Sequence, residues 1–408
     1  MAEEIFLSVR DGFVRVAHII GGQLADVQIS PADTKSDDAS NFVGRIYLAQ
    51  VERVVPRLQA AFVNIGEDRA GFLGAREARV LLPDAPRDAA IEDCVSEGDT
   101  ILVQVTRPPV NDKGAQVTAD VTLPGRALVI APCRSHIALS RAIEDPEARK
   151  RLEQDIVDIQ AGKHGDVEEV EGMDGPAGWV VRTAAADMDV SELKLDMELI
   201  GNRWNQLLDK AQNQEPPSLL YSDLGPIERA LRDSVRGDTQ KIVVEGDAAF
   251  TVASSYCREA MPGALEALEK SDKNEFLFDR YDIESKIEAA LSPRVELPSG
   301  GWLMIETTEA MTTVDVNSGS QNGTPLDVNL EAAAVIGQQI QLRGIGGLVA
   351  IDFIDMSEGS ANEKVVEVLS AGFGQDRFPV RIGTMSDFGV IEMTRRRPAI
   401  SLREAMGR

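Results

Sequence analysis

Hydrophobic and polar positions alternate over the first thirty residues, and this period of two predicts β-strands. The strands are expected at residues 4–9, 12–20 and 24–29. Asp11-Gly12 and Gly21-Gly22 separate them, and such pairs are typical of two-residue hairpin turns. We therefore expect a small antiparallel sheet at the N-terminus, followed by a polar linker over residues 31–41.

Short hydrophobic stretches continue from residue 42 at close, regular spacing, and they predict a small closed barrel of strands. The stretches are 42–55, 60–66, 70–75, 100–107 and 115–123. The segment between Ala75 and Asp99 is rich in proline and aspartate, so we expect a loop there.

From residue 126 the hydrophobic period lengthens in places, which indicates helices between the strands. Helices are expected at 146–160, 191–214, 225–235 and 249–261, and strands at 127–132, 178–185 and 241–246. Beyond about residue 290 the pattern becomes strand, helix, strand, helix over 302–317, 329–344, 347–356 and 363–376. Because 408 residues are too many for one core, we expect an α+β protein of several domains.

Composition excludes several protein classes. No apolar run of about 18 residues exists, so we expect no membrane span, and the acidic N-terminus does not resemble a secretory signal. Cys94, Cys133 and Cys257 have no paired spacing, which argues against a disulfide framework and against a cysteine zinc site. These features predict a protein of the reducing cytoplasm.

The formal net charge of −25 argues against nucleic-acid binding, which normally requires a basic surface. The charge is unevenly distributed, however. Residues 377–408 contain seven arginines and three acidic residues, so this segment carries 7 − 3 = +4. Composition alone favours an exposed basic tail over a phosphate-binding surface.

Acidic residues follow two hydrophobic strands near the C-terminus. One strand leads into Asp315 and Asn317, and the next leads into Asp352 and Asp355. Carboxylates that emerge from neighbouring strand ends can share a divalent cation, and oxygen ligands favour Mg²⁺. Asn317 would point the same way as Asp315 along an extended strand, whereas Asp352 would face away from Asp355. A single aspartate in such a position is also a common turn former or helix cap, and spacing alone does not identify RNA as a substrate.

The segments TTVDVNSGS, NLEAA, LRGIGGLVAIDFIDM and FGVIEMTRRRP resemble signatures of the ribonuclease E/G family. Further matches include IESKIEAAL, RVELPSGG, AAFVNIGEDRAGFL and VVRTAA, and all follow the family's order. The resemblance implies an endoribonuclease of RNA processing and decay that cuts single-stranded RNA and leaves 5′-phosphate and 3′-hydroxyl ends. It also implies that Asp315 and Asp355 bind Mg²⁺ and that Asn317 assists them.

The resemblance implies a definite domain order. An RNase H-like domain would combine residues 1–36 and 223–288, and it would contain an inserted OB-fold (37–119) and a 5′-sensor domain (120–222). A DNase I-like catalytic domain (289–408) would follow.

In the OB-fold, Phe62, Phe72 and Lys113 match RNA-binding positions of the family. An exposed aromatic ring can stack on a base. The alternative is that both phenylalanines belong to the core, and their sequence context by itself favours that alternative.

In the sensor domain, Arg182 and Thr183 match the residues that bind a 5′-monophosphate, and Gly125 and Val129 match the lining of that pocket. A guanidinium can hold a phosphate through two hydrogen bonds, a hydroxyl adds a donor, and a glycine lets the backbone approach the ligand. The resemblance therefore implies a preference for 5′-monophosphorylated, unpaired, AU-rich RNA. Without it, Arg182 would be interpreted as a surface arginine at a strand end.

The chain departs from the family pattern at its C-terminal end. Family members that share a zinc ion between two chains carry a Cys-x-x-Cys motif after the catalytic domain, and no cysteine follows Cys257 here. We therefore expect a short member without structural zinc and without the C-terminal scaffold, in which any homodimer forms without a zinc link. The alternative function is a non-catalytic RNA-binding or ribosome-associated protein with the same fold.

Overall fold

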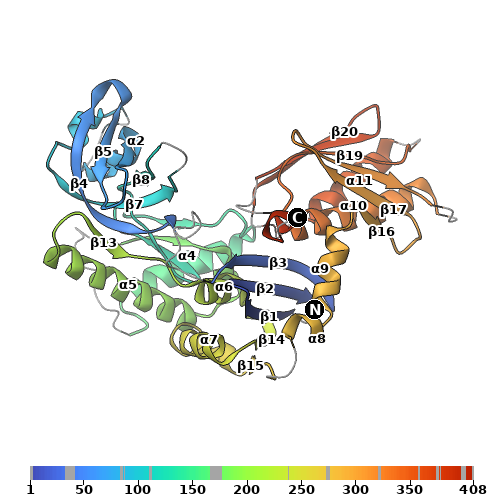
Figure 1. The fold of residues 1–408 in the computed structure, drawn as a ribbon, viewed down its shortest axis with the longest axis horizontal. Coiled ribbons are helices and arrows are strands. Elements are labelled where there is room, and N and C mark those ends of the chain that lie inside the picture. The colour runs from blue at the N-terminus through green and yellow to red at the C-terminus, as the bar shows by residue number, and fades with distance from the viewer. Residues whose placement is uncertain are drawn as a thin grey trace. The chain divides into compact units, whose positions relative to one another are not determined.

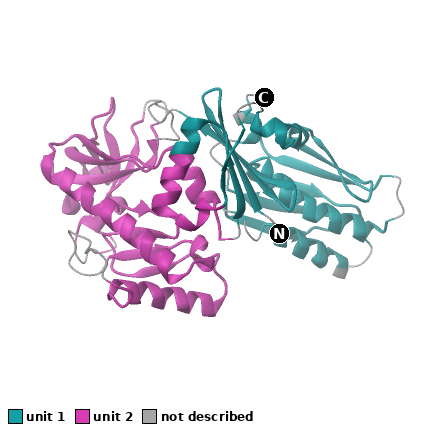
Figure 2. Cartoon of the chain, turned by 90° about the horizontal axis from the view of Figure 1, so that it is seen from below, with its two compact units in different colours: residues 1–32, 238–251, 267–408 teal, residues 33–237, 252–266 magenta. Residues whose placement is uncertain are grey.

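A computed structural model of the chain shows a mixed α+β protein (Figure 1). It describes residues 3–32, 42–82, 86, 88–109, 113–165, 177–237, 239–272, 276–319, 323–356, 359–373, 376, 378–396 and 401–406. The chain forms two compact units, of which unit 1 comprises residues 1–32, 238–251 and 267–408 and unit 2 comprises 33–237 and 252–266 (Figure 2). Within the described part, no helix combines the length and the apolar character needed to cross a membrane.

The N-terminal strands of unit 1 form the expected hairpins and belong to a five-stranded sheet with the order β15-β14-β1-β2-β3. Its strands are β1 (Glu3–Arg10), β2 (Phe13–Ile20), β3 (Gln23–Pro31), β14 (Thr239–Val244) and β15 (Leu268–Lys270). Both turns use positive φ angles, with 51° at Asp11 and 80° at Gly12, as such turns require. β1 also pairs with β14, more than two hundred residues later in the chain. Helices α8 (Leu277–Arg280) and α9 (Ile283–Leu291) share a hydrophobic core with this sheet.

The second sheet of unit 1 carries the acidic strand ends and has the order β16-β17-β18-β19-β21-β20. Its strands are β16 (Arg294–Glu296), β17 (Trp302–Thr307), β18 (Thr312–Asn317), β19 (Gly347–Asp352), β20 (Val380–Met385) and β21 (Val390–Arg395). The expected strand over 302–317 is a hairpin, because the chain turns at Thr308, whose N–H donates to the Met311 carbonyl at 2.9 Å. The helices of this region are α10 (Pro325–Leu342), α11 (Gly359–Ala371) and the short α12 (Leu402–Ala405).

One face of this second sheet is buried under α10 and α11. Val314 and Val316 of β18 contribute to the same core as Ala332 and Ile336 of α10 and Val365 of α11. Because successive side chains of a strand point to opposite faces, the alternate residues point away from the helices. We call this side of the sheet, whose side chains are exposed or half-buried, the open face. It carries Arg294, Glu296, Trp302, Met304, Glu306, Thr313, Asp315, Asn317, Leu348, Ala350, Asp352, Arg381, Val390, Glu392 and Thr394.

Unit 2 contains the expected closed barrel of five strands, which is consistent with an OB-fold. The strands are β4 (Ile46–Val55), β5 (Ala60–Asn64), β6 (Gly71–Gly74), β7 (Thr100–Arg107) and β8 (Gln116–Thr118). Pairing between β4 and β7 closes it, and β13 (Ser218–Tyr221) adds to the edge of β4. The expected loop between Ala75 and Asp99 contains short helices, so that expectation was wrong in part. They are α2 (Ala75–Ala78), the 3-10 turn η2 (Arg79–Leu81) and α3 (Ile91–Cys94).

The rest of unit 2 packs two long helices around a four-stranded sheet with the order β11-β12-β10-β9. Its strands are β9 (Leu123–Pro124), β10 (Leu128–Ala131), β11 (Ile137–Leu139) and β12 (Gly178–Val181), and its helices are α4 (Pro146–Gln160) and α5 (Val190–Asn213). The helices occupy the segments that periodicity predicted, and each begins at an aspartate cap, Asp145 or Asp189.

Helix α6 (Pro226–Ser234) also belongs to unit 2, whereas α7 (Asp247–Ala260) spans the boundary of the two units. Three further 3-10 turns are η1 (Pro56–Leu58), η3 (Thr183–Asp187) and η4 (Pro262–Leu265). The expected linker over residues 31–41 lies mostly outside the described residues.

Candidate active site and binding surfaces

Asp315 and Asp352 lie side by side on the open face of the second sheet of unit 1. They are direct partners in the parallel register of β18 and β19, and both side chains are exposed. Asn317 follows on the same face, and its Nδ2 donates to Asp315 Oδ2 at 2.8 Å. Because Val314 and Val316 must point into the core, these polar residues are forced outward. The two carboxyl strand ends therefore present adjacent carboxylates, as expected for neighbouring parallel strands.

Asp355 lies three residues beyond Asp352, in the loop that follows β19. Asn329 of α10 holds this loop, because its fully buried amide makes two hydrogen bonds to the backbone of Ile354. Asn329 Nδ2 donates to the Ile354 carbonyl at 2.7 Å, and the Ile354 N–H donates to Asn329 Oδ1 at 3.1 Å. The core of the domain thus fixes the residue directly before Asp355.

The turn between β20 and β21 closes the other side of this loop. The Phe353 N–H donates to the Gly389 carbonyl at 3.3 Å, and a Cβ atom placed on Gly389 would lie 3.5 Å from Asp355 Oδ1. Two elements therefore position Asp355: Asn329 binds the backbone of Ile354, the residue before it, and the β20–β21 turn lies alongside it.

The sequence-based interpretation of Asp352 needs revision. Strand alternation suggested that Asp352 would face away from Asp355, but β19 ends at Asp352, so alternation does not extend to Asp355. Asp352 is the register partner of Asp315, and both side chains are exposed on the same face.

The carboxylates and the amide at this sheet edge offer oxygen atoms as ligands, and oxygen ligands are what a hard cation such as Mg²⁺ prefers. Mg²⁺ keeps several waters and needs only one or two carboxylates from a protein. Over the described ranges, no three acidic, histidine or cysteine side chains gather closely enough to form a metal-binding group.

An aromatic and a basic side chain lie next to these carboxylates on the open face. Trp302 is the register partner of Asn317, and the Arg294 guanidinium lies over its ring at 4.3 Å from the centroid. Arg294 Nε also donates to Glu296 at 2.6 Å. Neither Trp302 nor Arg294 stood out in the sequence, because their position on this face depends on strand pairing.

Phe62 and Phe72 lie on the outside of the barrel, so the core interpretation of these residues is wrong. They are register partners on β5 and β6, their rings meet edge to face at 6.0 Å between centroids, and both side chains are half-buried. Their neighbours Ala61, Val63 and Leu73 fill the barrel interior instead. Two adjacent aromatic rings on an outer barrel surface are a typical stacking platform for bases.

Three basic side chains lie on or beside barrel strands near this aromatic pair. Lys113 is exposed and lies shortly before β8, the strand that pairs with β6. The Phe72 N–H donates to the Ala115 carbonyl at 2.8 Å. Arg53 is the register partner of Phe62 and lies 5.4 Å from its ring centroid, and Arg107 is exposed on β7. Arg53 and Arg107 were missed in the sequence, since nothing in their spacing places them beside the phenylalanines.

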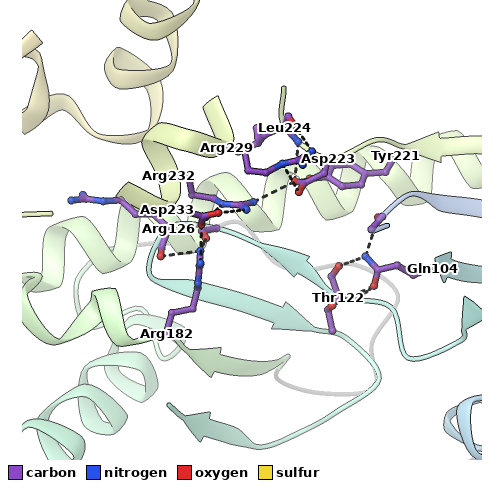
Figure 3. A network of polar contacts seen from close by, with 12 residues as sticks. Gln104, Thr122, Arg126, Arg182, Tyr221, Asp223, Leu224, Arg229, Arg232 and Asp233 are labelled. Atoms are coloured by element: carbon purple, nitrogen blue, oxygen red, sulfur yellow. Dashed lines mark hydrogen bonds and ion pairs between the residues drawn. The ribbon is translucent and has the colours of Figure 1, made fainter. Parts of the chain in front are cut away.

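Arg182 is part of a dense polar network in the second half of unit 2 (Figure 3). Its Nη1 donates to the Gly125 carbonyl at 2.7 Å, and its Nη2 donates to Asp233 Oδ1 at 2.8 Å. Asp233 also accepts from Nε and Nη2 of Arg232, at 3.0 and 3.1 Å. Burial alone would raise the pKa of Asp233, but the guanidiniums of Arg232 and Arg182 outweigh it and hold that pKa below its usual value. The Arg182 fork thus already holds one anion, the Asp233 carboxylate.

The four expected sensor residues lie around one edge of the four-stranded sheet. Arg182 contacts Gly125 directly, Val129 pairs with Pro124 next to it, and Thr183 is exposed with its Oγ1 2.8 Å from Ser140 Oγ. The structure explains why position 125 is a glycine, because a Cβ atom there would collide with the Asp196 carboxylate.

Asp196 fixes the backbone beneath this edge. Its buried carboxylate accepts from the N–H groups of residues 126, 127 and 128 at 2.8–2.9 Å. Burial raises the pKa of Asp196, and these three hydrogen bonds partly offset that effect. The loop that carries the Gly125 carbonyl is therefore rigidly placed.

The basic C-terminal segment is not a simple exposed tail. β20 and β21 belong to the second sheet of unit 1, and Arg395 is buried in an ion pair with Asp376, at 2.6 Å from Nε to Oδ2. Arg381, Arg396 and Arg403 are exposed, whereas positions 377, 397 and 408 lie outside the described residues. One of the seven arginines is thus structural and unavailable to phosphate.

Comparison with known proteins identifies the family of this chain. A sequence model described as the ribonuclease E/G family matches residues 122–398. Ribonuclease G of Escherichia coli (strain K12) is 33% identical over 422 residues, an alignment that covers 100% of this chain and 82% of the relative. Ribonuclease E of Haemophilus influenzae is 34% identical over 403 residues, which cover 96% of this chain and 41% of the relative. The chain belongs to the ribonuclease E/G family.

Proposed function

We propose that this protein is an endoribonuclease that hydrolyses phosphodiester bonds of single-stranded RNA, and that Asp315, Asn317 and Asp355 carry the reaction. The observation that carries this proposal is the parallel register that pairs Asp315 with Asp352 on the open face, with Asp355 held in the loop directly beyond. The relatives that match the full chain are named ribonuclease G, which supports RNA as the substrate class.

The proposal extends to the domains, with the boundaries given by the sequence analysis. The five-stranded sheet of β1–β3, β14 and β15 would be the RNase H-like domain, and the second sheet with α10 and α11 would be the DNase I-like catalytic domain. The barrel would be the inserted OB-fold, and the four-stranded sheet with α4 and α5 would be the 5′ sensor.

The oxygen donors on the sheet edge fit Mg²⁺, which Asp315 and Asp355 would hold. Bound there, the cation would stabilise the charge that develops on the phosphate and would lower the pKa of a water molecule. The side chain of Asn317 orients Asp315 through the hydrogen bond at 2.8 Å and lies on the face that the phosphate would approach. Asn329 keeps Asp355 at this edge through the backbone of Ile354.

Substrate choice follows from the two surfaces of unit 2. The rings of Phe62 and Phe72 with Lys113 would bind bases and phosphates of an unpaired strand, which suits AU-rich RNA because weakly paired sequences remain single-stranded. Arg182, together with Gly125, Val129 and Thr183, would bind a 5′-monophosphate, which would replace the Asp233 carboxylate on the Arg182 guanidinium, and would favour substrates that carry one. The reaction would leave 5′-phosphate and 3′-hydroxyl ends and would serve RNA processing and decay.

The test is cleavage of a 5′-monophosphorylated, unpaired oligoribonucleotide with and without Mg²⁺. We expect cleavage only with the cation, and we expect Asp315→Asn and Asp355→Asn each to reduce the rate by about a thousandfold, the effect of several kcal/mol. RNA binding, measured separately by fluorescence anisotropy, should change little because no phosphate contact is removed.

The matched control is Glu306→Gln. Glu306 is an exposed carboxylate on the same open face, but it lies on β17 opposite Thr313 rather than at a strand end. This variant should cleave at close to the unmodified rate. Unmodified protein that binds RNA but leaves it intact in Mg²⁺ would instead indicate the non-catalytic RNA-binding alternative.

A further inference from the structure

The turn between β20 and β21 carries Phe388, whose side chain is 86% exposed. No other large hydrophobic side chain in the described ranges is as exposed. The turn is tight, since the Gly389 N–H donates to the Ser386 carbonyl at 3.1 Å and Ser386 N–H donates to the Val390 carbonyl at 2.9 Å. Gly389 adopts a φ of 76°, which favours glycine and makes the turn possible. The ring is therefore presented to solvent on a well-defined backbone.

Exposure alone does not mark Phe388 as functional, because single exposed hydrophobic side chains are common on protein surfaces. Its position is the informative feature. The next residue, Gly389, accepts a hydrogen bond from Phe353 and lies alongside Asp355, while Val390 is the register partner of Asp352. Phe388 is thus one residue from the backbone that borders the carboxylates.

The chemistry of the turn indicates which part of an RNA would meet it. The four residues Ser386 to Gly389 include one charged side chain, the exposed carboxylate of Asp387, and none that is basic. A carboxylate repels phosphate, whereas an aromatic ring offers any base a flat apolar surface. A base, rather than the backbone of the nucleic acid, is the group that suits this turn.

We propose that Phe388 stacks on the base of a nucleotide that flanks the scissile phosphate. This inference rests on the proposed function and adds a base-binding position at the catalytic edge, apart from the barrel surface. Stacking on this ring would hold the flanking nucleotide splayed and unpaired, so that the phosphate can reach Asp315 and Asp355. Because every base has such a surface, the contact would select unpaired RNA without reading its sequence.

The first test measures binding, in the Asp315→Asn background so that the RNA stays intact. We expect the addition of Phe388→Ala to weaken binding of the 5′-monophosphorylated oligoribonucleotide by about 5- to 100-fold, the range for one lost stack. Phe388→Trp should restore it. A change below twofold for Phe388→Ala would overturn the proposal, whether or not the unmodified protein cleaves RNA.

The second test separates stacking from a structural role. In a series of RNAs, an abasic site replaces the base at one position after another. At the position that Phe388 contacts, the abasic site should weaken binding by the protein with Phe388 but should not add to the effect of Phe388→Ala. Full additivity at every position would show that the ring does not contact a base. The matched control is Phe13→Ala, a half-exposed phenylalanine on β2 of the other sheet of unit 1, which should leave binding unchanged.

Cleavage by the protein with Asp315 intact is measured in parallel. If the protein with Asp315 does not cleave RNA but Phe388→Ala still weakens binding, only the proposed function is contradicted. If that protein cleaves RNA but Phe388→Ala leaves binding unchanged, only the stacking is contradicted. Thermal unfolding should be the same for the Phe388 variants, because the exposed ring contributes little to the core.

Discussion

Asn329 offers the sharpest test of how the fold positions the carboxylates. Its side chain is 0% exposed and makes both of its hydrogen bonds to Ile354, directly before Asp355. Asn329→Ala would leave a backbone N–H and a backbone carbonyl without partners, at a cost of about 1–3 kcal/mol each when fully buried. Ile354 is half-buried and water can partly replace the amide, so we expect the free energy of unfolding to fall by roughly 2–4 kcal/mol.

The effect on cleavage should exceed the effect on folding. A loop that is no longer held would shift Asp355, and a displacement of about 1 Å can reduce a rate by about a hundredfold. Urea unfolding followed by circular dichroism gives the stability change, and single-turnover cleavage of the RNA substrate, corrected for the folded fraction, gives the rate. Asn329→Asp keeps an acceptor for the Ile354 N–H but buries a carboxylate whose other oxygen faces the Ile354 carbonyl, so its loss of stability should be at least as large as that of Asn329→Ala.

Gln341 provides a matched control near the other end of the same helix. Its Nε2 donates to the Gly372 carbonyl at 2.7 Å, so Gln341→Ala also removes a hydrogen bond between α10 and the backbone. This variant should lose stability but keep its cleavage rate per folded molecule. If Asn329→Ala behaved in the same way, the positioning role of Asn329 would be refuted and its hydrogen bonds would be only structural.

Two further predictions concern unit 2. Because Arg232 and Arg182 hold the pKa of Asp233 below its unfolded value, the stabilisation from this carboxylate is present above about pH 4 and is lost as the pH falls further. Asp233→Asn should therefore flatten the acid side of a stability curve measured by urea unfolding, and an unchanged curve would contradict this. Phe62→Ala with Phe72→Ala should weaken single-stranded RNA binding by about tenfold or more, and equal affinity by fluorescence anisotropy would exclude these rings as a stacking surface.

Local sequence signals were sufficient for most elements of the fold. The hairpins of β1–β3 follow from approximate alternation and two turn pairs, and helices α4 and α5 follow from apolar residues at helical spacing with aspartate caps. The pairing of Asp315 with the end of β19 was also anticipated, since parallel neighbours end at the same sheet edge. The hairpins and helices depend on residues that are close together in the chain, whereas the pairing of Asp315 with the end of β19 was inferred from the general layout of parallel strands.

Features that depend on tertiary pairing were missed or misjudged. The segment NLEAA matched a family signature, but the contact of Asn329 with Ile354 joins residues 25 positions apart and has no local signal. The core interpretation of Phe62 and Phe72 failed because half-buried strands show the same alternation whichever face is inside. Arg395 looked like part of a basic surface, yet its ion pair with Asp376 buries it. In each case the deciding contact comes from another element.

The catalytic geometry proposed for this protein depends on the strand register of the second sheet. Val314 and Val316 pack against α10 and α11, and this burial is what turns Asp315 and Asn317 outward. A slip of one residue in β18 would point both aspartate and asparagine into an apolar core and expose the valines, which is disfavoured on both counts. The same hydrophobic contacts that stabilise the domain therefore select the one register in which Asp315 meets Asp352. The packing that stabilises the sheet thus also places the carboxylates of Asp315 and Asp352. Asn329 then holds Asp355, which lies beyond the last residue of β19.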